Sequence, residues 1–355
     1  MTPGTTPGTT PGTTDEALQR ILEEGRARAA ATDPEHGRLW DALAAATEGG
    51  KRFRPALLTA IHEALDGTCT TAAVEVGAAV ELLHTAFVIH DDVIDGDVLR
   101  RGRLNVSGTF HAAALTSGAD PDDADAFGRT AGILAGDLAL AAAIRAVATC
   151  GASTEVTHRL LDLFDAALHT TAAGELADVR LSLGDGTASV PESLAMEEQK
   201  TSAYSFALPL QAGAVLAGAE EQTVRRLGAA GRMLGIAFQL GDDVLGVFGD
   251  PAVTGKSVTS DLRSRKQTPL LAHAQSTPEW DEIGAYVGRD LTDDELDEIR
   301  RLLTASGSRG FVEELAEAHL SGARTAIGQL GIDPDLLSTV VSRAHVLADS
   351  NGVAA

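Results

Sequence analysis

The stretch TAAVEVGAAVELLHTAFVIHDD, residues 71–92, is almost wholly apolar until it ends in two aspartates. It contains few helix breakers, and a helix that is apolar on all sides is buried in the middle of a bundle. The stretch therefore predicts a core helix whose last turn carries Asp91 and Asp92. Neighbouring carboxylates repel one another and resist removal from water. We expect a positively charged group to hold them.

A second pair, Asp242 and Asp243, ends another apolar run, GIAFQLGDDVLGVFGD at 235–250. A hard divalent ion suits such pairs, and Mg²⁺ commonly takes one or two carboxylates and shares its remaining positions with substrate phosphates. Gly246 stands where a third aspartate would repeat the spacing of the first group. Two carboxylates are still enough for one ion whose other ligands are phosphate and water.

The first acidic group also contains Asp95. Helical geometry places Asp91 and Asp95 on one face, with Asp92 about 100° further round the axis. That arrangement suits two ions bridged by carboxylates. A solvated acidic helix end is the alternative interpretation of DDVID, but the preceding apolar run argues against it. The basic pair Arg100 and Arg101, which follows directly, can grip phosphate oxygens.

The rest of the chain also has the pattern of helices. Apolar positions recur at helical spacing from residue 15 onward, and the alternation typical of strands is absent. No composition shift marks a second domain. We therefore predict an all-α protein with a single domain, residues 15–355, built as one large helical bundle. Further buried helices are expected at 129–148, 156–182, 200–217 and 228–248, with turn-forming segments at 116–125, 183–193 and 249–261.

The first 14 residues differ from the rest. MTPGTTPGTTPGTT contains three copies of Pro-Gly-Thr-Thr. Proline and glycine at this density form neither a helix nor a buried core. We predict a disordered tail over residues 1–14.

The net charge and the composition limit the kinds of molecule that the protein is expected to bind. The formal net charge of −23 argues against binding to nucleic acid and to anionic membrane surfaces, although a metal and a local basic cluster still allow an anionic substrate. No uninterrupted apolar run is long enough to span a bilayer, so no stable membrane insertion is expected. The two cysteines, Cys69 and Cys150, do not form a disulfide framework, which is typical of the cytoplasm.

Lysine is unusually rare. The chain has only four, at positions 51, 200, 256 and 266, and its other basic side chains are arginines. A lysine kept against such a bias indicates a place where a compact point charge is needed, because arginine is a broad planar fork. Four chance surface lysines are the alternative, but two of them flank the loop that follows the second aspartate pair.

These motifs together resemble those of the trans-isoprenyl diphosphate synthases, the polyprenyl synthetase family. The resemblance runs from about residue 15 to residue 350. Any one motif is modest, but their shared order and spacing are specific. The matching segments are GGKRFRP (49–55), DDVIDGDVLRRG (91–102), ILAGD (133–137), GELADV (174–179), Lys200-Thr201, FQLGDD (238–243), DPAVTGK (250–256) and Lys266.

The resemblance implies an all-α fold around a deep central cavity and usually a homodimer. It implies head-to-tail condensation of isopentenyl diphosphate with an allylic diphosphate (dimethylallyl, geranyl or farnesyl) and three Mg²⁺ ions when substrate is bound. The residues implied as metal ligands and catalytic groups are Asp91, Asp92, Asp95, Asp242 and Asp243, with Lys200 as a further catalytic residue.

The resemblance also implies two diphosphate sites. The residues implied for isopentenyl diphosphate are Lys51, Arg54, His84 and Arg101. Those implied for the allylic diphosphate are Arg100, Lys200, Thr201, Gln239, Lys256 and Lys266, with Asp178 near Lys200 and the metal. The chain departs from the family pattern in three places: Gly246 replaces an aspartate, Glu175 stands where glutamine is frequent, and residues 256–266 differ most from the common sequences.

Product length in such enzymes depends on cavity depth before the first aspartate motif. Phe87 lies four residues before Asp91, Ala86 five and Leu83 eight. Phe87 as a floor favours a C15 product, and Ala86 as an opening favours C20 or longer; side-chain direction on the helix decides between them. We expect C20 slightly ahead of C15.

Two other functions share this fold. A class I terpene cyclase would need an Asn/Ser motif, but the only asparagines, Asn105 and Asn351, are not in such a pattern. A cyclase also has no use for a second diphosphate site. A non-catalytic prenyltransferase-like subunit is the other alternative, and the intact acids and lysines argue against it.

Overall fold

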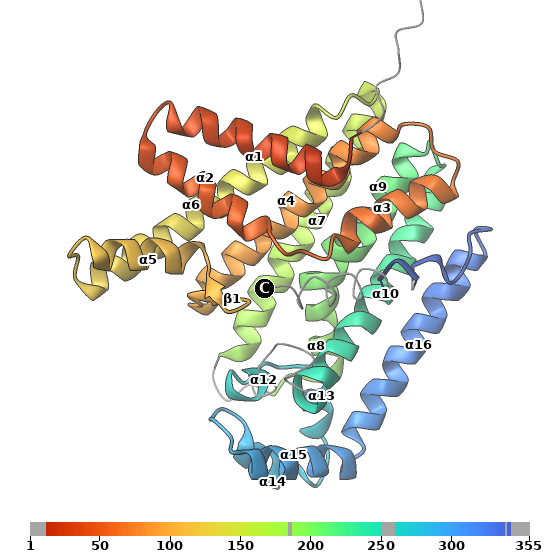
Figure 1. The fold of residues 1–355 in the computed structure, drawn as a ribbon. Helices are drawn as coiled ribbons and strands as arrows, with labels where there is room; N and C mark the ends of the chain where they lie inside the picture. Colours follow the sequence, from red (N-terminus) through yellow and green to blue (C-terminus); the bar gives the residue numbers. More distant parts are fainter. Residues whose placement is uncertain (1–11, 184–186, 250–259, 338, 342–355) are drawn as a thin grey trace, which may run out of the picture. The chain divides into compact units, whose positions relative to one another are not determined.

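The computed structural model describes residues 12–183, 187–249, 260–337 and 339–341 (Figure 1). Nearly all of the regular structure in these residues is helical, as predicted. The chain forms two compact units: Met1–Leu161 with Ala212–Ala219 and Leu337–Ala355, and Asp162–Gln211 with Glu220–Leu336. The prediction of one domain over 15–355 remains a prediction.

Unit 1 is built on two long helices, α4 (Thr70–Asp95) and α6 (Pro121–Ala148), which pack against each other. Small side chains on α6, such as Ala135 and Ala139, and larger ones on α4, such as Leu82, are fully buried. The other elements of unit 1 are α1 (Thr14–Ala30), α2 (Pro34–Thr47), α3 (Phe53–Ala64), β1 (Leu99–Arg100), β2 (Arg103–Leu104) and α5 (Val106–Thr116).

The start of α1 corrects the predicted end of the tail. Thr14 already belongs to the helix, and the Thr13 side chain accepts a hydrogen bond from the Glu16 backbone N–H. The Glu16 carboxylate in turn accepts one from the Thr13 backbone. This capping box satisfies two N–H groups at the helix end. The predicted disorder over residues 1–11 lies outside the described residues.

A small hairpin, which the sequence analysis did not predict, follows α4. Strands β1 and β2 pair antiparallel, Leu99 with Leu104 and Arg100 with Arg103. The connecting residues Arg101 and Gly102 both have positive φ, as a tight two-residue hairpin turn requires. The turn places Arg100 and Arg101 close to the end of α4.

Helices α4 and α6 are long and apolar enough, by length and composition, to cross a membrane. The prediction based on uninterrupted apolar runs did not identify them. Most of the apolar window of α4, 72%, is buried inside the protein, and half of that of α6 is buried. The core helix of a soluble protein has the same length and composition. The two helices pack against each other, although the large apolar side chains Phe127, Ile133 and Leu134 of α6 are exposed.

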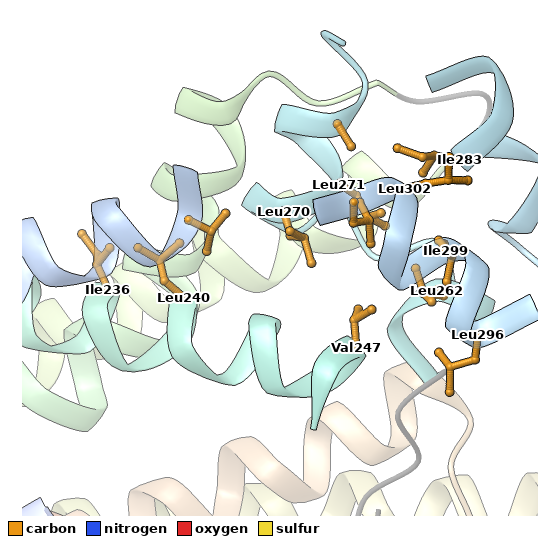
Figure 2. Close-up of a cluster of buried hydrophobic side chains, with 13 residues drawn as sticks. Ile236, Leu240, Val247, Leu262, Leu270, Leu271, Ile283, Leu296, Ile299 and Leu302 are labelled. Atoms are coloured by element: carbon orange, nitrogen blue, oxygen red, sulfur yellow. The ribbon is translucent and has the colours of Figure 1, made fainter. Parts of the chain in front are cut away.

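Unit 2 is also helical. Helix α10 (Glu221–Phe248) packs along α16 (Ser308–Gly328) and along a π-helix, Glu198–Ala207. A cluster of buried apolar side chains, including Leu240, joins α10 to the later helices (Figure 2). The remaining elements are α7 (Thr154–Ser182) and α9 (Leu208–Leu216), which extend into unit 1, α8 (Val190–Glu197), α12 (Ser260–Arg263), α13 (Pro269–Ala274), α14 (Trp280–Ile283), a 3₁₀ turn (Gly284–Tyr286) and α15 (Asp293–Ala305).

The π-helix interrupts the helix predicted over 200–217. Such segments are rare and occur frequently at functional sites. Here the π-helix contains Lys200 and Thr201. Gly235 of α10 packs against Ser202, where an added Cβ would lie 2.5 Å from the Ser202 side chain. The close approach of the two backbones fixes the π-helix on α10.

Candidate active site

The last turn of α4 brings the first acidic group together with an arginine. Arg100 donates from Nε to Asp92 Oδ1 at 2.8 Å, and its Nη2 contacts Asp92 and Asp91. Asp92 is buried, Asp91 is half-buried and Asp95 is exposed at the helix end. Burial raises the pKa of Asp92, and the Arg100 hydrogen bond opposes that shift only in part. The group thus contains a buried acid with a strong need for positive charge.

A basic cluster lies two turns earlier on the same helix. His84 faces Arg54 and Arg101, and burial followed by the charges of these arginines lowers its pKa well below the ordinary value. Arg54 is buried, with its guanidinium over the Phe53 ring. Lys51, in the loop before α3, is exposed. The structure therefore gathers Arg54, His84 and Arg101 into a positive group that suits an anion.

Arg52 and Glu81, which were not among the predicted site residues, hold this cluster in place. Arg52, with a positive φ of 51°, donates to Glu81 Oε2 at 3.0 Å, to Asp15 Oδ1 at 2.7 Å and to the Thr47 carbonyl at 2.9 Å. Arg101 donates to the Glu48 carbonyl. These contacts fix both ends of the loop that carries Lys51. The sequence does contain a clue to this contact: Glu81 lies in an otherwise apolar helix, and a buried carboxylate requires a positively charged partner.

The chain-length candidates lie on the apolar part of α4. Leu83 and Ala86 are fully buried among the helices of unit 1. Phe87 is half-buried and lies one turn before Asp91, on the same face of the helix. Of the three, Phe87 is the side chain that shares the face of the first acidic group.

In unit 2, Lys200 is held by two carboxylates of α7. Its Nζ lies 2.6 Å from Asp178 Oδ2 and 3.1 Å from Glu175 Oε1. The predicted proximity of Asp178 and Lys200 is therefore observed. Thr201, the next residue in the π-helix, is half-buried.

The second aspartate pair is accompanied by a further acid. Gln239 donates to Asp243 Oδ1 at 3.1 Å, one turn along α10. Asp243 is buried, and burial raises its pKa to about 7. Glu197, at the end of α8, is also buried beside it, and burial followed by the Asp243 charge raises the pKa of Glu197 well above its ordinary value. Glu197 was not among the predicted site residues, because α8 and α10 are distant in the chain.

The space left by Gly246 is occupied from another segment. A Cβ added at Gly246 would lie 2.8 Å from Asp261 Oδ2. Asp261, in α12, also lies 4.0 Å from Lys266 Nζ. Its carboxylate therefore reaches the position where a third aspartate side chain would begin, next to Asp242 and Asp243 on α10. Lys256 lies outside the described residues.

The acidic residues of the site show whether a divalent ion could be bound there. Among the described residues, no three His, Cys, Asp or Glu side chains form a metal site by themselves. Asp243 Oδ2 and Glu197 Oε2 are, however, buried and have no hydrogen-bond partner among the residues described. Buried acceptor oxygens of this kind suit a hard cation that obtains its remaining ligands from outside the protein.

Comparison with known proteins identifies the same group that the motifs indicate. Residues 38–303 match the family "Polyprenyl synthetase". The chain is 33% identical to a geranylfarnesyl diphosphate synthase of Aeropyrum pernix, over 79% of this chain and 84% of that protein. It is 32% identical to a geranylgeranyl diphosphate synthase of Mycobacterium tuberculosis, over 90% of this chain and 87% of that protein. A (2E,6E)-farnesyl diphosphate synthase of the same organism is 33% identical, over 84% and 79%.

A solved structure has the same fold. The crystal structure of a geranylgeranyl pyrophosphate synthase from Corynebacterium glutamicum, complexed with isoprenyl diphosphate and magnesium, superposes with a TM-score of 0.83. Its sequence is 29% identical, and the match covers 93% of this chain and 96% of that one.

The Glu197–Asp243 pair predicts a particular dependence of stability on pH in metal-free protein. Both folded-state pKa values are raised, so between about pH 4 and pH 7 the folded protein holds protons that the unfolded chain releases. This contribution to the free energy of unfolding is full below the unfolded pKa and is lost as pH rises through the folded pKa. Replacing Glu197 with Gln removes the repulsion.

Urea unfolding in EDTA at pH 5, 6, 7 and 8 checks this. Relative to wild type, Glu197→Gln should become progressively more stable as the pH rises from 5 to 8. Glu198→Gln, at the next position but in an ion pair with Arg232, should keep the wild-type profile. Parallel profiles for wild type and Glu197→Gln would show that the pair does not titrate as described.

Proposed function

The chain belongs to the polyprenyl synthetase family and is a prenyltransferase, and from this premise we propose that it condenses isopentenyl diphosphate head to tail with an allylic diphosphate (dimethylallyl, geranyl or farnesyl) in a Mg²⁺-dependent reaction. The product is a short-chain polyprenyl diphosphate, with C20 slightly ahead of C15.

One observation supports a two-substrate reaction most strongly. Helix α4 carries two different features for anions, and both belong to unit 1. The acidic end at Asp91 and Asp92 suits a diphosphate that arrives with metal. The basic group around His84, about 10 Å earlier along the helix by its rise per residue, suits a diphosphate without metal. A terpene cyclase binds one diphosphate and has no use for the second feature.

Mg²⁺ would be held by the acids at the two aspartate motifs. Asp91, Asp92 and Asp95 supply one set of oxygens, and Asp242 and Asp243 supply the other, for three ions in all. When bound, the ions act as Lewis acids on the diphosphate leaving group. The orphaned Asp243 oxygen supports this assignment.

The chain's own residues carry the rest of the reaction. Arg100, Lys200 and Lys266 neutralise the charge that develops on the departing diphosphate, which is catalysis by preorganised electrostatics. Lys256 has the same proposed role from the loop outside the described residues. Thr201 and Gln239 face the allylic carbocation.

Isopentenyl diphosphate is held by Lys51, Arg54, His84 and Arg101. Its alkene attacks C1 of the allylic cation, and apolar walls keep water away from that cation. The departing diphosphate takes the proton that is lost. His84 is not the base: its lowered pKa and arginine neighbours suit hydrogen bonding to an anion.

The comparisons leave product length open, because relatives that make C15, C20 and C25 products are almost equally similar. The solved relatives named as geranylgeranyl pyrophosphate synthases support C20. The half-buried Phe87 on the Asp91 face is the feature that would instead favour C15.

We also propose a cytoplasmic homodimer. Phe127, Ile133 and Leu134 on α6 are large apolar side chains that are each at least 44% exposed, and a second copy of the chain would cover such a face. Both cysteines are free thiols, as a reducing compartment permits.

Incorporation of labelled isopentenyl diphosphate tests the proposed reaction. The purified protein should form labelled polyprenyl diphosphates with Mg²⁺ and at least one of dimethylallyl, geranyl or farnesyl diphosphate, and none in EDTA. Cyclic hydrocarbon from an allylic diphosphate alone would identify a cyclase. Failure to incorporate label with all three primers would reject the proposal.

Phe87→Ala tests the control of product length. If Phe87 is the floor, its removal deepens the cavity and lengthens the product by at least one five-carbon unit, as seen by chromatography of the dephosphorylated products. Val88→Ala, a smaller truncation at the next position and on a different face of α4, should leave the length unchanged. An unchanged length in Phe87→Ala would show that another side chain limits the product.

A further inference from the structure

Glu197 and Asp243 form a pair of buried carboxyl groups in unit 2. Each residue is 4% exposed, and the two carboxyl groups lie within hydrogen-bonding reach of each other. The Gln239 amide donates to Asp243 Oδ1, but Asp243 Oδ2 and Glu197 Oε2 have no hydrogen-bond partner among the described residues. Two ionised carboxylates cannot satisfy each other, because both only accept hydrogen bonds. The pair therefore presents two buried acceptor oxygens to a cation.

The backbone holds Glu197 in this position. Glu197 is the last residue of α8 and leads directly into the π-helix. A Cβ added at Gly235 of α10 would lie 2.5 Å from the Ser202 side chain, and one added at Gly231 would lie 2.6 Å from the Ala207 Cα. The π-helix is thus in close contact with α10 at two places one turn apart. The segment that follows Glu197 and the helix that carries the second aspartate pair are held together.

The charges around Glu197 do not balance its own. The charges that act on it most strongly are those of Asp243, Asp178 and Asp261, which are all acids. Asp178 and Asp261 each have a lysine ammonium within 4.0 Å. The two unpartnered oxygens of the Glu197–Asp243 pair have no such neighbour within the described part of the chain. The positive charge that this pair requires must come from a ligand.

We propose that Glu197 is a further ligand of the divalent ion at the second aspartate pair, which it binds together with Asp243. The inference rests on the proposed function, which places Mg²⁺ at Asp242 and Asp243. Among the described residues, no group of three possible ligands forms a complete site. The ion therefore completes its shell with phosphate and water, as Mg²⁺ bound by one or two carboxylates commonly does.

Glu197 fits this role better than Asp261, the other acid that approaches the pair from outside α10. Asp261 Oδ2 lies 2.8 Å from the position of a Cβ added at Gly246, so Asp261 takes the space of the absent third aspartate. Its side chain is 25% exposed and faces Lys266. Glu197 is more deeply buried and is in direct reach of Asp243, so it supplies a carboxylate where a cation is needed most.

Thermal unfolding measures the Mg²⁺ requirement without an assay of activity. At a fixed concentration of inorganic diphosphate, the Tm of the full chain should rise as Mg²⁺ is added. Glu197→Gln removes the charge of one ligand and lets its amide N–H donate to Asp243. It should increase the Mg²⁺ concentration at the midpoint of this rise about 10- to 100-fold, the usual effect of changing a group next to a bound metal.

Glu198→Gln is the matched control, because it removes one negative charge at the next position, from an ion pair with Arg232. It should keep the wild-type midpoint. The Tm of each variant in EDTA shows that it is folded. A wild-type midpoint in folded Glu197→Gln, or an equal shift in Glu198→Gln, would overturn the proposal.

Asp243→Asn separates the two levels of inference. If this variant also keeps the wild-type midpoint, the metal site of the proposed function is wrong. If it raises the midpoint and Glu197→Gln does not, only the inference about Glu197 fails.

Crystals of the wild-type protein grown with Mn²⁺ and inorganic diphosphate give a direct readout that does not depend on the folding of a variant. The anomalous signal of Mn²⁺ should lie at bonding distance from a Glu197 carboxylate oxygen. An ion bonded to Asp242 or Asp243 but not to Glu197 would overturn the proposal and leave the proposed function standing.

Discussion

A carboxylate buried at the end of an apolar helix needs positive charge, and this requirement organises the functional parts of both units. In unit 1, Asp92 is buried at the end of α4 and its pKa is raised even with Arg100 in contact. In unit 2, Asp243 is buried beside Glu197, each with an oxygen that lacks a partner among the described residues. A bound cation would therefore offset part of the free-energy cost of burying these acids.

The two units use different basic side chains to hold acidic groups and backbone carbonyls. Unit 1 uses arginines, whose planar forks can hold carboxylates and backbone carbonyls at fixed angles, as Arg52 and Arg101 do. Unit 2 uses Lys200, a flexible point charge that can change partners. A rigid set of arginines suits the placement of one substrate, and a mobile lysine suits a leaving group that must be captured and then released.

Contacts between residues close together in the chain could be predicted from the sequence, whereas contacts between distant segments could not. The contact of Arg100 with Asp91 and Asp92 was predictable because a helix end and a short turn place these residues side by side. The helices themselves were predictable because their apolar runs are long, although α6 begins at Pro121, inside a predicted turn, because Asp120 caps it. Contacts between distant segments were not predictable: Arg52 with Glu81, Glu197 with Asp243, and Asp261 at Gly246 arise from packing. The roles assigned by resemblance to the site residues remain predictions.

The central claim is that the acids bind metal together with diphosphate rather than alone. Thermal unfolding of the full chain with Mg²⁺, with inorganic diphosphate, and with both tests it most directly. The account predicts a small change in Tm with either alone and a large increase with both, growing with the logarithm of their concentration. The account would be contradicted if Mg²⁺ alone raised Tm as much as Mg²⁺ and diphosphate together, or if the two together did not raise Tm.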